Sequence, residues 1–102
     1  MFIHTAFFWV DRTLSKDQVE AFERGLKSLE KIPMLREMHW GKPSPRFNLV
    51  VDPTYSYGVT MIFDDEARHN EYLAHPIHEE FSNQHSKKFT RIVVYDYFKE
   101  MP

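Results

Sequence analysis

Residues 2–10, Phe-Ile-His-Thr-Ala-Phe-Phe-Trp-Val, decide the fold of this 102-residue chain. Aromatic and β-branched side chains dominate the stretch, which is typical of a β-strand. Successive side chains of a strand point to opposite faces of its sheet. One face would carry Phe2, His4, Ala6, Phe8 and Val10, and the other Ile3, Thr5, Phe7 and Trp9. Both faces are largely apolar, so the strand needs a covering layer on each side.

Two helical segments are predicted to supply one of those layers. The first covers residues 15–32, where Ser15 and Gln18 form a capping-box pattern and Pro33 ends the helix. Its apolar residues recur at spacings of three and four, at Val19, Phe22, Leu26 and Leu29. The second begins after Asp64-Asp65, breaks at His75, restarts at Pro76 and continues to about residue 88, because a proline disfavours helical geometry in the residue before it.

Three further strands are predicted at residues 34–40, 55–63 and 90–98, with an irregular connection over residues 41–52 that contains Pro43 and Pro45. The order strand, helix, strand, strand, helix, strand is the split βαβ, or ferredoxin-like, arrangement. We therefore expect one α+β domain over residues 1–102, with a four-stranded antiparallel sheet and both helices on one face.

The sheet face without helices is predicted to be a protein interface. An antiparallel sheet with one face in water should carry polar residues on that face. Both faces of residues 2–10 and of residues 90–98 instead carry several large apolar side chains. The simplest way to bury such a patch is against the same face of a second copy. We therefore expect a homodimer in which two sheets pack face to face, forming a dimeric α/β barrel.

Composition excludes several classes of function. The chain has no cysteine, which rules out disulfides, iron–sulfur clusters and thiol nucleophiles. Its formal charge of -2 gives no electrostatic basis for binding nucleic acid or an anionic membrane. No stretch approaches the roughly 18 apolar residues of a membrane helix, and the N-terminus does not resemble a signal peptide. We expect a cytoplasmic protein.

Histidine and tyrosine are the candidate chemical groups. The chain has six histidines, of which His75 and His78 flank Pro76 at the predicted helix break. A sheet-borne His4 and a helix-borne Tyr72–His78 pair could meet across a pocket between the two layers, where imidazole can act as general acid or base. The proline distorts the His-x-x-His spacing, so no bound metal is expected. The structural alternative is that these groups hold the helix break through hydrogen bonds. We expect the other three histidines at the surface or in loops: His39, His69 and His85.

The run from Tyr72 to Phe81, Tyr-Leu-Ala-His-Pro-Ile-His-Glu-Glu-Phe, resembles the signature of the stress-responsive A/B barrel domain (Dabb) family. The resemblance covers nearly the whole chain and implies a ferredoxin-like protomer and a homodimer. A plant member of the family cyclises a polyketide without a cofactor, using a Tyr and a His that match Tyr72 and His78. Two of its other histidines match His4 and His75, but Tyr57 stands where that enzyme has a pocket histidine.

Two classes of function remain open from the sequence. One is a cofactor-independent enzyme, cyclase- or lyase-like, that acts on a small apolar or polyketide-like ligand. In that case Tyr72 and His78 would be the catalytic pair, and His4, Tyr57 and His75 would bind the substrate. The other is a non-catalytic dimeric protein that binds a small molecule or serves in a stress response.

Overall fold

The computed structural model describes residues 1–100 of the chain. Four strands, three helices and two short 3-10 turns follow one another along it. They are β1 (Phe2–Val10), α1 (Lys16–Ser28), η1 (Leu29–Lys31), β2 (Glu37–Gly41), β3 (Tyr57–Phe63), α2 (Glu66–Ala74), α3 (Pro76–His85), η2 (Ser86–Lys88) and β4 (Phe89–Phe98). No helix among these residues is long and apolar enough to span a membrane.

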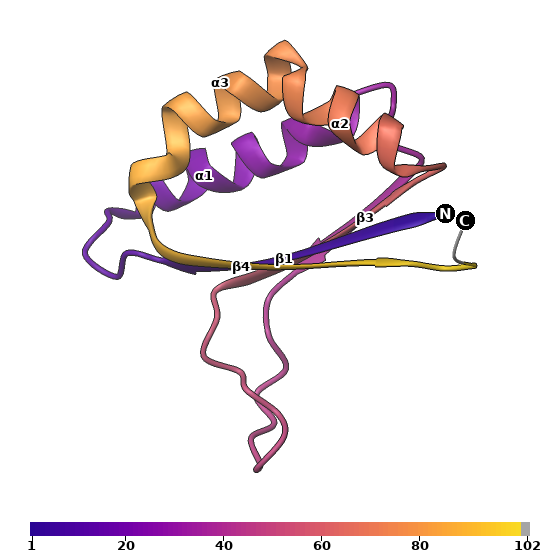
Figure 1. The fold of residues 1–102 in the computed structure, drawn as a ribbon. Helices are drawn as coiled ribbons and strands as arrows, with labels where there is room; N and C mark the ends of the chain where they lie inside the picture. Colours follow the sequence, from indigo (N-terminus) through magenta and orange to yellow (C-terminus); the bar gives the residue numbers. More distant parts are fainter. Residues whose placement is uncertain (101–102) are drawn as a thin grey trace.

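The four strands form one sheet in the order β2-β3-β1-β4, and every neighbouring pair is antiparallel. All three helices lie on one face of this sheet (Figure 1). Strand β1 is central, and its Phe2 is opposite Phe63 of β3 on one side and Phe98 of β4 on the other. The predicted α+β, ferredoxin-like fold is confirmed.

Several element boundaries differ from the predicted ones. Helix α1 begins after Ser15 with the expected capping box, but its last turn tightens into η1. Strand β2 starts at Glu37, three residues later than expected, because its ladder with β3 begins at the Glu37–Ile62 pair. In the connection from β2 to β3, the Asn48 side chain accepts the backbone N–H groups of Val50 and Val51 and bends the chain into a turn.

The break between α2 and α3 is where the sequence predicts it. The Asp65 side chain caps α2 by accepting the N–H of Arg68. His75 has an extended backbone, with φ -70° and ψ 140°, and Pro76 occupies the first turn of α3. Nδ1 of His75 accepts the backbone N–H of Ile77 at 3.1 Å. One residue therefore ends α2 and caps α3.

The core lies between the helices and the inner face of the sheet. Phe22 of α1 is fully buried, and its ring packs near the rings of Phe8, Tyr57, Phe81 and Phe89. Aromatic rings in such edge and tilted arrangements contribute beyond the area they bury. This cluster fixes α1 and α3 against β1, and so fixes the distance between the two layers.

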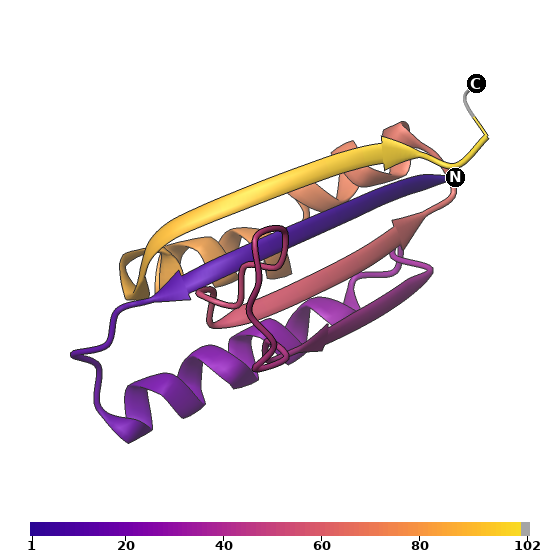
Figure 2. The ribbon, with the colours of Figure 1, turned by 90° about the horizontal axis from the view of Figure 1, so that it is seen from below.

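The opposite face of the sheet has no helix over it. Register and alternation place Phe7 and Trp9 of β1 beside Val93 and Tyr95 of β4 on this face, and Tyr95 is 64% exposed. The long connection between β2 and β3 descends from the same face (Figures 1 and 2). It carries three exposed apolar side chains: Phe47, Leu49 and Val50. Both faces of β1 are therefore apolar, as the sequence indicates.

Phe22→Ala should lower the free energy of unfolding by about 3–5 kcal/mol, because it leaves a cavity among the four aromatic rings that surround Phe22. The measurement is urea denaturation followed by circular dichroism. Glu20→Ala, at an exposed position of the same helix, is the control and should change the free energy by less than about 0.5 kcal/mol. Equal effects of the two substitutions would contradict this account of the core.

Candidate functional site

A cavity of about 280 Å³ lies between α2–α3 and the inner face of the sheet. Most of its walls are apolar, and three ring-bearing polar residues, His4, Tyr72 and His78, complete them. Ile92 and Val94 of β4 also line it, yet each is more than two-fifths exposed. The cavity therefore opens between α3 and the β4 edge of the sheet. A mostly apolar pocket with a few convergent polar groups is the usual form of a small-molecule site.

His4 is held in the cavity wall by a carboxylate on the neighbouring strand. Its Nδ1 lies 2.7 Å from Oδ1 of Asp96, the residue directly opposite in the β1–β4 ladder. A carboxylate at neutral pH only accepts hydrogen bonds, so Nδ1 of His4 must donate. This bond fixes the ring orientation and leaves Nε2 as the nitrogen available to other groups.

Tyr72 and His78 form a contacting pair although the helix breaks between them. Their ring centroids are 4.8 Å apart. Burial raises the pKa of Tyr72, so its hydroxyl stays protonated. Burial lowers the pKa of His78, and a hydrogen bond to the backbone of Leu73 opposes this in part. His78 is therefore neutral at pH 7. One nitrogen of a neutral imidazole carries no proton, so it is able to accept one.

His69 belongs to the same cluster, and its predicted place at the surface is wrong. It is 7% exposed, and its ring centroid lies 4.8 Å from that of His4 and 5.8 Å from that of Tyr72. Burial and the nearby His4 lower its pKa. Its Nε2 is the one buried side-chain nitrogen or oxygen of residues 1–100 without a hydrogen-bond partner. The sequence does contain a signal for this position: His69 lies three residues before Tyr72 in the same helix, and residues at that spacing share one helix face.

Tyr57 and His75, expected beside these residues, do not line the cavity. Tyr57 points toward α1, where its hydroxyl donates to the Glu23 carboxylate at 2.9 Å. Burial and that carboxylate raise the pKa of Tyr57 to about 12. The His75 ring is engaged in capping α3. The structure thus brings together three of the five predicted residues: His4, Tyr72 and His78.

The two remaining histidines have different environments. His39 is exposed, as expected, and pairs with Glu37 at 2.7 Å. His85 is only 4% exposed, so its predicted surface position is wrong. It fits against α1 because residue 25 is glycine, where a Cβ would lie 2.4 Å from its Nε2. Within residues 1–100, no three histidine, aspartate or glutamate side chains are placed to hold a metal ion together.

Comparison with known proteins identifies the family. A sequence model of the stress-responsive A/B barrel domain, abbreviated Dabb, matches residues 2–99. The chain belongs to the Dabb family. Olivetolic acid cyclase of Cannabis sativa is 22% identical to it over 87 residues, which are 85% of this chain and 84% of the cyclase.

Two solved structures show the same fold. A hydroxynitrile lyase from Passiflora edulis matches with a TM-score of 0.79 and 22% identity, over 98% of this Dabb chain and 94% of the lyase. A dimeric ferredoxin-like protein from Thermobifida fusca matches with a TM-score of 0.75 and 24% identity, over 94% and 88% of the two chains. At these identities the structural likeness extends to the fold alone.

The free energy of unfolding should fall as the pH drops below about 6.5, which is the ordinary pKa of a histidine side chain. His69, His78 and His85 have lowered pKa values in the folded protein. The unfolded chain therefore takes up protons first, which favours unfolding until the folded pKa values are reached. Urea midpoints measured at pH 7.5 and 5.5 test this expectation. His69→Phe should reduce the difference, and a midpoint in the parent protein that does not change with pH would contradict the assignment.

His75→Ala should lower the free energy of unfolding by about 1 kcal/mol, because α3 loses its N-terminal cap. Thermal or urea denaturation provides the measurement. His39→Ala is the matched control, because that ring is exposed and bonded only to the exposed Glu37. If the two variants were equally stable, the capping role of His75 would be wrong.

Proposed function

We propose that this Dabb protein is a cofactor-independent enzyme that moves a proton on a small apolar carbonyl or hydroxyl compound. One observation carries the proposal: three proton-bearing rings, those of His4, Tyr72 and His78, line a single apolar cavity of about 280 Å³. Polar groups in an apolar wall cost stability unless they are bonded. Their convergence on one space is therefore better suited to a bound ligand than to packing alone.

The three rings have different tasks in the proposed reaction. His78 is neutral and takes the proton from the ligand, since a base with a pKa near or below neutrality is unprotonated and ready at pH 7. Tyr72 remains protonated and donates a hydrogen bond to the oxygen that gains negative charge. His4, oriented by Asp96, contacts the ligand from the sheet side.

The walls set the kind of ligand. Phe8, Val59, Met61 and Phe81 contribute aromatic and aliphatic surface, and no lysine or arginine lines the cavity. A charged ligand would therefore lose its hydration without finding a counter-ion. The volume suits a compound of about ten non-hydrogen atoms at the small end of ordinary ligand pockets. The relatives named above are a cyclase and a hydroxynitrile lyase, and both names are compatible with proton transfer on compounds of this kind.

The second candidate is a non-catalytic protein that binds a small molecule in the same cavity. It is favoured by the packing of Tyr72 against Phe63 and His69, which makes the tyrosine a core residue as well as a wall residue. The two candidates differ in whether the protein accelerates proton transfer, and this can be measured directly.

The enzyme hypothesis is tested with acetophenone in D₂O, following exchange of its methyl protons by NMR. The protein should accelerate exchange, and His78→Asn and Tyr72→Phe should each reduce the acceleration by at least about 100-fold, the usual contribution of a positioned acid or base. His39→Asn is the matched control and should have no effect. Mandelonitrile cleavage is assayed in parallel. Binding of acetophenone without exchange or cleavage would support the non-catalytic candidate.

We also propose that two copies associate through the open face of the sheet. The apolar residues exposed there and the dimeric state of the relative from Thermobifida fusca support this arrangement. Light scattering should give twice the chain mass of 12.3 kDa at micromolar concentration. Tyr95→Lys should shift the protein to the monomer, because it places a charge in the centre of the face. Ala67→Lys, at an exposed position of α2, should leave the dimer intact. A parent protein that is monomeric would contradict the proposal.

A further inference from the structure

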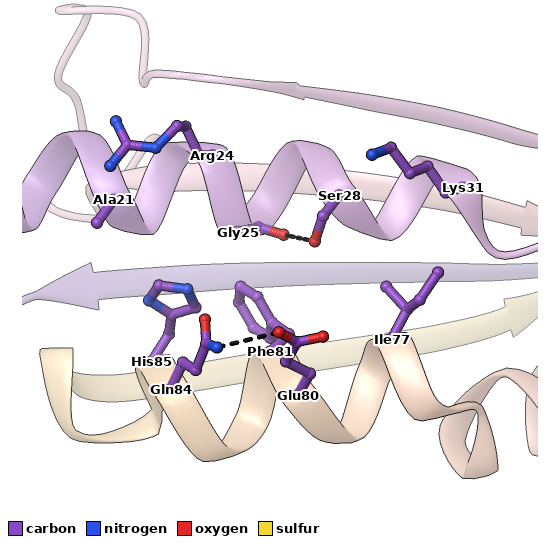
Figure 3. Close-up of a pocket in the computed structure, with 10 residues that line it drawn as sticks. All are labelled: Ala21, Arg24, Gly25, Ser28, Lys31, Ile77, Glu80, Phe81, Gln84 and His85. Atoms are coloured by element: carbon purple, nitrogen blue, oxygen red, sulfur yellow. Dashed lines mark hydrogen bonds between the residues drawn. The ribbon is translucent and has the colours of Figure 1, made fainter.

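Several polar side chains in the hollow between α1 and α3 already have partners within the chain (Figure 3). The Ser28 hydroxyl donates to the Gly25 carbonyl, and the Gln84 amide donates to the Glu80 carboxylate at 3.1 Å. The His85 ring packs against Gly25. This hollow therefore gives no sign of a bound molecule. The side chains that lack a cover lie on the other side of the molecule, at the open face of the sheet.

The connection between β2 and β3 forms an arm, residues 42–56, that stands out from the open face (Figures 1 and 2). Two hydrogen bonds fix its returning half to β1. Nε1 of Trp9 donates to Oγ1 of Thr54 at 3.0 Å. The backbone N–H of Ser56 donates to the Phe8 carbonyl at 2.7 Å. The arm therefore has a fixed origin on the sheet.

The tip of the arm is apolar. Phe47 is 74% exposed, Leu49 is fully exposed and Val50 is 91% exposed. The Asn48 side chain holds these residues in a turn by accepting two backbone N–H groups. Turns are normally built from small and polar residues, and neighbouring large apolar side chains in water mark an interaction site. The tip therefore needs a surface that covers it.

A hollow of about 350 Å³ lies in the angle between the arm and the open face. Much of its floor is aromatic, because the Phe7 ring lies 4.9 Å from that of Tyr55 and 6.5 Å from that of Tyr95. Its two charged groups, Asp52 and Arg91, are opposite in sign. The hollow therefore favours a neutral apolar group, and such groups are what the tip of an arm presents.

The tip and the hollow lie on the same side of one chain, so the surface is complementary to itself. Two copies related by a two-fold axis each supply both parts, and the exchange closes at two chains. Packed sheets lie only about 10 Å apart. An arm that stands out from each open face must therefore be accommodated by the other copy when two such faces meet.

We propose that the apolar tip of each arm inserts into the hollow of a second copy, so that the two arms clasp the dimer. Phe47 and Leu49 of one chain then cover the aromatic floor of the other. This inference rests on the association through the open face proposed above. It names the segment that holds the two copies together.

The experiment uses single cysteines, because the chain has none of its own. Leu49→Cys and Val93→Cys proteins, one of them lengthened by an affinity tag, are mixed, left to exchange subunits and treated with a short bis-maleimide. A product that joins the two different chains is expected, since Val93 lines the hollow. Leu49→Cys mixed with Ala67→Cys, at an exposed position of α2, is the matched control and should give little of this product.

A second variant measures how strongly the clasp holds. Leu49→Ser should raise the dissociation constant of the dimer about 100-fold, because each dimer loses two buried leucine side chains. Sedimentation equilibrium over a concentration series provides the constant. Leu73→Ser, the same substitution at a partly exposed leucine of α2, is the matched control and should leave the constant unchanged.

The outcomes separate the clasp from the association itself. A dimeric parent whose Leu49→Cys and Val93→Cys variants cross-link no more than the control pair overturns the clasp and leaves the association standing. A monomeric parent overturns both. A Leu49→Cys/Val93→Cys double variant that is bridged only within one chain shows that the arm folds onto its own sheet, which also overturns the clasp. So does a Leu49→Ser dimer as tight as that of the parent.

Discussion

The break at His75–Pro76 is the constraint on which the arrangement of polar groups depends. Pro76 cannot continue α2, and it holds His75 extended, so α3 restarts with a new direction and a new helical phase. As a result His69 and Tyr72 project inward from α2, while His78, Phe81 and His85 project inward from α3. A continuous helix would turn some of these side chains away from the sheet. The break therefore brings side chains of α2 and α3 to one cavity, whose remaining walls come from α1 and the sheet.

The chemistry that the cavity can support depends on the contacts that its polar side chains already make. The Nδ1 of His4 is bonded to Asp96, which fixes that ring and leaves Nε2 available. The ring of His78 lies against the ring of Tyr72, with centroids 4.8 Å apart. The surrounding apolar walls disfavour charge, so His78 stays neutral and Tyr72 stays protonated. A base and a donor can coexist at pH 7 because burial moves their pKa values apart.

Much of the fold could be predicted from local patterns, because alternation, caps and prolines act within a few residues. The capping box at Ser15 and the break at His75 are such signals. The places of His69 and His85 depend on tertiary contacts instead. His85 is buried only because Gly25, sixty residues earlier, leaves room for its ring. Likewise Tyr57 points inward as expected, but it contacts α1 rather than the cavity. The alternation of a strand predicts which face of the sheet a side chain is on, but it does not predict which helix that side chain contacts.

Strand β1 places the cavity and the proposed dimer surface on opposite faces of the sheet. Its even-numbered residues, among them His4, Ala6 and Phe8, form the floor of the cavity. Its odd-numbered residues Phe7 and Trp9 form the open face. Because the side-chain period is two, a one-residue slip would exchange the faces, placing His4 outside and Trp9 against the helices. The long ladders with β3 and β4 prevent this slip. The proposed association of two copies through the odd face therefore requires no rearrangement of the even face, which carries the cavity residues.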